Sequence, residues 1–165
     1  MTALNYHDIA ASVLKLAASI DHRMEPSSQE MHDNRKNAWA ALFTGQVWPA
    51  EAEGAVIDHY RDPRAFPLMP GDVIAYCKSQ PVWSSVEHAR DWVMRTAVQM
   101  PYSGAIEAYS GVTEPIIDIP AEIGRESHKA YLIQKLTEWV APRLDELAAA
   151  IVAKRFTPWW NEAPK

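Results

Sequence analysis

Apolar residues recur at steps of three and four positions over most of this chain, which is the spacing of one face of a helix. The first stretch covers residues 4–21 and predicts an amphipathic helix. Its expected inward face carries Leu4, Ile9, Val13, Leu16, Ala17 and Ile20. Pro26 separates this helix from the next, because a proline in a helix interior removes a backbone hydrogen bond.

A second helix is predicted from the sequence SSQE, in which Ser27 is the expected N-cap and Glu30 completes a capping box. Gly45 is the expected end of this helix. The same spacing rule predicts an inward face made of Met31, Ala38, Trp39, Leu42 and Phe43.

Prolines begin the next two predicted helices, since the first turn of a helix does not need the N–H that proline lacks. Pro49 opens a helix with one side lined by Ala52, Ala55, Val56, His59 and Tyr60. The sequence RDPRAFPLMPGD then predicts a loop. Pro70 opens a fourth helix, which runs through Cys77 and ends at Pro81.

The second half of the chain continues the helical pattern. Ser84 or Ser85 caps a helix that stops before Pro101, and residues 101–120 hold at most a short helical turn. A long helix is predicted over about residues 120–155, and Pro142 must kink or break it. The one strand-like segment, EPIIDIP, is short and bounded by prolines.

The predicted fold class is therefore all-α. We expect a compact multi-helix bundle with a long Pro-kinked C-terminal helix, built as one bundle or as two packed helical subdomains. The best seam is Pro81–Trp83. It divides the chain into a four-helix module over residues 1–80 and a C-terminal helical region with an aromatic-basic tail over residues 81–165.

Composition indicates a soluble globular protein, with 48% hydrophobic and 22% charged residues and a net charge of -5. This charge disfavours binding to a phosphate backbone. The single cysteine suits a reducing compartment, the N-terminus lacks a charged signal region, and no apolar run approaches the roughly 18 residues of a membrane span. We expect a cytoplasmic protein that does not contact a membrane.

Candidate catalytic groups do not assemble into a recognised pattern. Asp58 and His59 are neighbours and therefore do not face each other on a helix, and Cys77 falls on an inward face. The sequence contains no HExxH, GxSxG, GxxxxGK[ST] or GxGxxG motif. We therefore predict a non-enzymatic protein with no catalytic residue, cofactor or metal ligand.

A DNA-reading helix-turn-helix does not fit the proline-rich stretch. Residues 61–69 separate its two predicted helices, whereas the motif joins them through about three or four residues. A basic patch could still form in three dimensions, and the alternative is a solvated surface beside two loops. The residues concerned are Arg35, Lys36, Arg61 and Arg64.

The C-terminal sequence KRFTPWWNEAPK combines aromatic and basic residues, which protein interfaces favour. It predicts a partner-binding tail, and the alternative is a tail that folds back over the bundle. The candidate partner-binding residues are Arg155, Phe156, Trp159 and Trp160.

Three sequence stretches between residues 38 and 77 resemble the N-terminal helical module of phage replicative-helicase loader and inhibitor proteins. They are AWAAL around Trp39, AVIDHY at 55–60 and FPLMPGDVIAYC at 66–77. The resemblance covers about the first 80 residues and rests on packing motifs. Residues 84–155 depart from it, because they are predicted as ordered helices where such proteins often continue into a less ordered tail.

The resemblance implies a phage replication accessory protein that binds a hexameric replicative helicase and either places it or holds it inactive. It also implies that Trp39, Leu42, Val56 and Tyr60 pack the module. Two alternatives stay open: a phage regulatory or host-takeover protein that inhibits a host factor, and a DNA-binding repressor. We do not expect nucleic acid to be bound directly.

Overall fold

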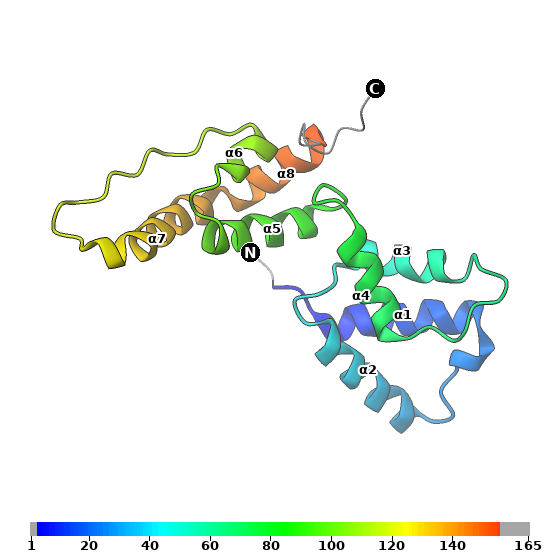
Figure 1. The fold of residues 1–165 in the computed structure, drawn as a ribbon. Helices are drawn as coiled ribbons and strands as arrows, with labels where there is room; N and C mark the ends of the chain where they lie inside the picture. The colour runs from blue at the N-terminus through cyan, green and yellow to red at the C-terminus, as the bar shows by residue number, and fades with distance from the viewer. Residues whose placement is uncertain (1–2, 156–165) are drawn as a thin grey trace. The chain divides into compact units, whose positions relative to one another are not determined.

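A computed structural model describes residues 3–155 of the chain (Figure 1). This range contains eight α-helices, three short 3₁₀-helices and no β-strand. The predicted all-α fold class is confirmed. The chain divides into two compact units, residues 1–80 and residues 81–165, and Pro81 of the predicted seam is the first residue of the second unit.

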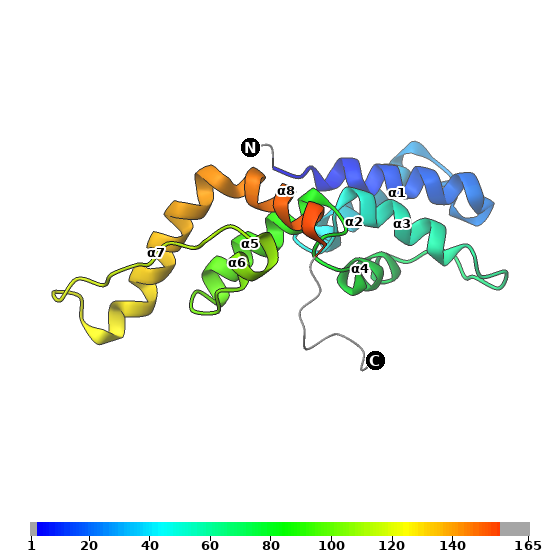
Figure 2. The same ribbon diagram turned by 90° about the horizontal axis from the view of Figure 1, so that it is seen from above.

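Unit 1 contains four α-helices: α1 (Tyr6–Ile20), α2 (Gln29–Phe43), α3 (Pro49–His59) and α4 (Pro70–Ser79). Helix α1 packs against α2 and α3, and α3 packs against α4 (Figures 1 and 2). Their inward faces form one core with the loop residue Leu68. Its fully buried side chains include Phe43, Val47, Val56, Leu68, Val73 and Cys77.

Helix α1 follows the predicted pattern closely. Asn5 caps its first turn, where the side-chain oxygen accepts hydrogen bonds from the amides of His7 and Asp8 at 3.1 and 3.2 Å. Of the predicted inward residues, Ile9, Val13 and Ala17 are buried and Leu4 and Leu16 are half-buried. Ile20, at the last turn, is exposed instead.

Helix α2 ends as predicted, because Gly45 follows its C-cap in the left-handed conformation with φ of 71°, but it departs from the prediction at its start and in its inward face. Its N-cap is Ser28 and not Ser27, because the Ser28 hydroxyl accepts the hydrogen bond from the amide of Met31 at 3.1 Å. Glu30 therefore lies one position too early to complete the expected capping box. The buried residues are Trp39, Ala40 and Phe43, whereas the predicted core residues Met31, Ala38 and Leu42 are exposed.

Unit 2 contains α5 (Val86–Gln99), α6 (Ala105–Ser110), α7 (His128–Val140) and α8 (Leu144–Lys154). Helix α5 packs against α7 and α8, and α6 packs against α8. Ser85 is the N-cap of α5, one of the two predicted alternatives. The fully buried side chains of this core include Val93, Ile106, Val140, Leu147 and Ile151.

The predicted long C-terminal helix is two helices. Pro142 lies in the 3₁₀ turn Ala141–Arg143 that separates α7 from α8, so it breaks the helix where it lacks an N–H. The helical region also begins later than expected, at His128 after a 3₁₀ turn over Arg125–Ser127. Residues 111–124, which include the strand-like segment, connect α6 to this 3₁₀ turn, and a turn over residues 121–123 follows the extended part.

Candidate protein-docking surfaces

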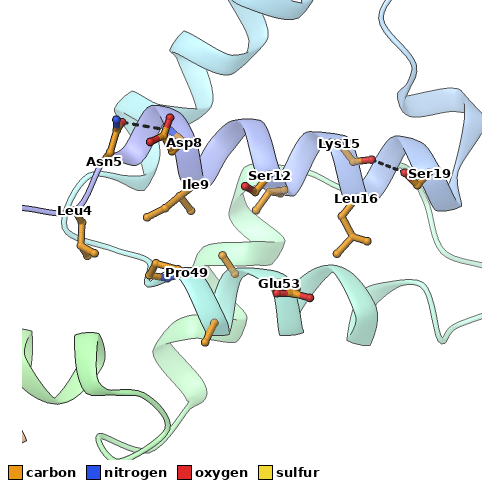
Figure 3. A pocket seen from close by; sticks show the side chains of 13 residues that line it. Leu4, Asn5, Asp8, Ile9, Ser12, Lys15, Leu16, Ser19, Pro49 and Glu53 are labelled. Carbon is orange, nitrogen blue, oxygen red and sulfur yellow. Dashed lines mark hydrogen bonds between the residues drawn. The ribbon is translucent and has the colours of Figure 1, made fainter. Parts of the chain in front are cut away.

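A groove of about 610 Å³ lies in unit 1 between α1 and the first turns of α3 (Figure 3). We call it the α1/α3 groove. It is lined by Leu4, Asn5, Asp8, Ile9, Ser12, Val13, Lys15, Leu16, Ser19, Pro49, Ala50, Ala52 and Glu53. The Asn5 cap starts α1 and Pro49 starts α3, so both walls begin at residues that fix a helix N-terminus.

The α1/α3 groove has an apolar floor and polar rims. Ile9 and Leu16 point from α1 toward α3, and Pro49 and Glu53 lie on the opposite wall (Figure 3). Ile9, Val13 and Ala52 belong to the buried core, whereas Ser12, Lys15 and Glu53 are exposed. An apolar floor with charged rims is the chemistry that receives one face of an amphipathic helix.

A second feature of unit 1 is the Pro-rich loop, residues 60–69, which joins α3 to α4. A buried carboxylate, Asp21, holds this loop. Arg23 binds Asp21 with two side-chain hydrogen bonds of 2.8 and 3.0 Å, and it also donates to the carbonyl of Ala65 at 2.9 Å. Tyr60 donates its hydroxyl hydrogen to Asp21 at 3.0 Å and accepts the amide hydrogen of Leu68 at 3.1 Å. We call Asp21, Arg23 and Tyr60 the Asp21 clamp.

The Asp21 clamp changes the titration of its members. Hydrogen bonds from the Arg23 side chain lower the pKa of Asp21 to about 2, with further support from the Arg23 amide and the Tyr60 hydroxyl, although burial opposes the shift. Burial raises the pKa of Tyr60, and the adjacent Asp21 carboxylate adds to this effect. The clamp is therefore held together by an ionised carboxylate at neutral pH.

His59 takes part in the same loop closure. Its Nε2 atom lies 2.6 Å from the carbonyl oxygen of Phe66, and its Nδ1 atom lies 4.0 Å from the carboxylate of Asp72. Asp72 in turn accepts the amide hydrogen of Met69 at 2.9 Å, at the start of α4. The neighbouring Asp58 is exposed on α3. His59 thus contacts backbone and a helix-capping residue.

The loop that these contacts hold displays apolar side chains to solvent. Phe66 is 81% exposed and Met69 is 60% exposed. Leu68, between them, is only 1% exposed and anchors the loop in the core. The Pro-rich loop is therefore a rigid element with an aromatic residue on its outer side.

The structure places the four predicted basic-patch residues on two elements. Arg35 and Lys36 lie on α2, where Arg35 donates to the carbonyl of Met24 at 2.7 Å and Lys36 lies 4.0 Å from Asp33. Arg61 and Arg64 are exposed in the Pro-rich loop. Part of this charge therefore serves local contacts, and the choice between a basic patch and a solvated surface stays open.

The predicted tail surface begins where the described residues end. Arg155 is exposed. It is the C-cap of α8 and has the left-handed conformation, with φ of 46°. Phe156, Trp159 and Trp160 lie outside the described residues. Their role in partner binding stays a prediction.

Cys77 has the buried position that its sequence context predicts. Its side chain is fully buried in the unit 1 core, and burial raises the pKa of the thiol to about 11. Within residues 3–155, no group of three or more His, Cys, Asp or Glu side chains is arranged to hold a metal ion. None of the helices in that range has the length and apolar character needed to span a membrane.

Sequence reasoning missed the Asp21 clamp and the α1/α3 groove. Asp21 and Tyr60 are 39 positions apart, and the Arg23–Ala65 contact spans 42 positions. A single sequence carries no signal for such a pairing. The sequence did carry a signal for the start of α1, one wall of the groove. Asn5 directly precedes an apolar helical pattern, which is typical of an N-cap.

Comparisons with protein families, with curated proteins and with solved structures found no match for this chain.

Proposed function

We propose that this chain is a non-enzymatic adaptor that binds a protein partner by accepting an amphipathic helix in the α1/α3 groove. We further propose that the partner is a hexameric replicative helicase in the cytoplasm of the cell that makes the protein. The α1/α3 groove is the observation that carries the proposal.

The lining of the groove supports a helix as its occupant. One wall runs along α1 and the residues just before it, from Leu4 to Ser19, and the opposite wall is the first turns of α3. Small side chains, Ser12 and Ser19 on one wall and Ala50 on the other, allow a partner backbone to approach closely. Leu4 and Leu16 are half-buried, so docking would bury apolar surface that water still contacts.

The resemblance to phage helicase loaders and inhibitors supports the choice of partner. The resembling segment, residues 38–77, includes all of α3 and hence one wall of the groove. Of the residues it implicates in packing, Trp39 and Val56 are buried and Tyr60 is a member of the Asp21 clamp, whereas Leu42 is 54% exposed. The packing residues of the motif thus shape the same unit that contains the groove.

The proposal is tested by measuring binding of the full-length chain to the purified hexameric replicative helicase of its host, by biolayer interferometry. Ser12→Arg introduces a long charged side chain at an exposed groove position and should weaken binding at least about tenfold. Asn34→Arg adds the same side chain at an exposed position on α2, outside the groove lining, and should leave binding unchanged.

Each outcome tests a different part of the proposal. If the natural chain does not bind the helicase, the helicase is not the partner. If the Ser12→Arg and Asn34→Arg proteins bind equally well, the α1/α3 groove is not the binding site. Truncation after Arg155 tests the predicted tail surface, Phe156, Trp159 and Trp160, in the same assay. Loss of binding only in the truncated protein would assign the contact to that tail.

A further inference from the structure

The connection over residues 111–124 carries a second surface, in unit 2, that the groove does not involve. It is longer than the median protein connection of about 4–6 residues, and long ordered connections are commonly functional. It runs extended between α6 and the turn before α7 (Figure 1). Ile116 in this segment is 94% exposed, the highest value among the large apolar side chains described.

The connection is fixed at its two ends. Near its start, Glu114 donates its amide hydrogen to the Glu107 carboxylate at 2.9 Å, and Gly111 donates its amide hydrogen to the carbonyl of Glu107 at 2.8 Å. Near its other end, the carbonyl oxygen of Ile123 lies 3.1 Å from the His128 ring. These contacts hold the two ends of the connection to α6 and α7. The central residues of the connection lie between those two ends.

The centre of the connection has the alternation of a β-strand. Ile117 and Ile119 are half-buried, and Ile117 packs against the unit 2 core, whereas Ile116 and Asp118 are exposed. Within the described residues, none pairs with residues 115–119 in a strand ladder. The stretch Ile116–Ile119 thus lies in an extended connection, and within the described residues no neighbouring strand pairs with its amide and carbonyl groups.

We propose that residues 115–120 bind a partner protein by strand addition, in which the segment extends an exposed edge of the partner's β-sheet. Residues 111–124 contain Glu114, Asp118 and Glu122 and no Lys or Arg. Because opposite charges attract, we expect the edge strand of the partner to be basic. Ile116 supplies the outward apolar contact.

The first test locates the partner at the segment in the full-length chain. A photo-crosslinking residue, benzoylphenylalanine, replaces Ile116, and in a matched protein it replaces Ile20, which is 48% exposed in unit 1. Irradiation in the host cell followed by mass spectrometry should give a crosslink from position 116 only, to a residue in an edge strand of another protein. A crosslink to a helix, to nucleic acid or to a second copy of this chain would overturn the proposal, as would no crosslink.

The second test separates a backbone ladder from a side-chain contact, using the purified partner identified by the crosslink. Asp118→Pro removes a backbone N–H from the strand and should weaken binding about tenfold or more. Asp118→Ala removes the charge but keeps that N–H, so it should weaken binding only a few-fold. Equal affinities for the two variants would contradict strand addition.

The surface is independent of the α1/α3 groove, so the two proposals can fail separately. Ser12→Arg should not affect the crosslink from position 116, and Asp118→Pro should not affect binding to the helicase. A crosslink that Ser12→Arg abolished would place both contacts in one interface and overturn the assignment of a second surface.

Discussion

The two units each contain a proline-bearing connection between helices, and the two connections are held in different ways. In unit 1, the backbone of the Pro-rich loop makes hydrogen bonds with side chains at Ala65, Phe66 and Leu68, and the Leu68 side chain is buried. In unit 2, the hydrogen bonds of the connection over residues 111–124 lie near its ends. In its centre Ile117 packs against the core, and Ile116 is exposed to solvent.

The difference shows that prolines alone do not determine how firmly a connection is held. Proline restricts φ in both segments. In the Pro-rich loop, Asp21 positions Tyr60 and Arg23, which in turn bond the backbone at Leu68 and Ala65. The side chains that bond the loop backbone come both from nearby, at His59 and Tyr60, and from a distance of 42 positions, at Arg23.

The largest expected contrast comes from shortening one apolar side chain in each connection. Leu68→Ala should lower the free energy of unfolding of unit 1 by about 2–5 kcal/mol, because Leu68 is 1% exposed and its loss leaves a cavity. Ile116→Ala should change the stability of unit 2 by no more than about 0.5 kcal/mol. Chemical denaturation with hydrogen exchange measures both values, and comparable losses for the two variants would contradict the contrast.

Removing one hydroxyl should loosen the Pro-rich loop by an intermediate amount. Tyr60→Phe deletes the acceptor for the buried amide of Leu68 and a donor to Asp21, so we expect a loss of about 1–3 kcal/mol. Amide exchange in residues 61–69 should accelerate. Tyr102→Phe serves as the control, since Tyr102 is 65% exposed in unit 2. Unchanged exchange in the Tyr60→Phe loop would mean that the clamp does not hold it.

The smallest expected effects are the pH dependences of the stability contributed by Asp21 and by Glu114, which have opposite signs. The pKa of Asp21 is lowered from 3.8 to about 2, so the stability it gives unit 1 is present above about pH 4 and is lost as pH falls toward 2. Burial raises the pKa of Glu114 above its usual 4.5, and the nearby Glu107 adds to this, although a backbone hydrogen bond from Glu107 opposes it. The contribution of Glu114 is therefore present below about pH 4 and is lost as pH rises through its raised pKa.

Two amide variants isolate these effects. Asp21→Asn should leave unit 1 less stable at neutral pH and should remove its loss of stability between pH 4 and 2. Glu114→Gln should make unit 2 slightly more stable near pH 7, by less than about 1 kcal/mol, with no gain at low pH. Urea denaturation from pH 2 to 7 measures both. Each variant is compared with the natural chain, because Glu138 of unit 2 also has a lowered pKa. A loss between pH 4 and 2 that persisted in Asp21→Asn, or no gain near pH 7 in Glu114→Gln, would show that the assigned causes are wrong.

The sequence predicted helices well and their contacts less well. Prolines 49 and 70 start α3 and α4 as expected, because their effect on the backbone is local. The predicted face of α2 failed at Met31 and Leu42, since apolar spacing does not tell which side of a mainly polar helix its neighbours cover. The α1/α3 groove was not predicted because it needs the distance between two helices, which periodicity does not contain.

The prolines around Ile116 also bear on aggregation. An exposed apolar strand is a hazard, because identical segments can stack into cross-β fibrils. Stacking of this kind requires about six or seven consecutive residues without proline, and Pro115 and Pro120 leave only residues 116–119 between them. The chain can therefore expose a short apolar segment at its surface while its own prolines oppose the stacking of that segment into a fibril.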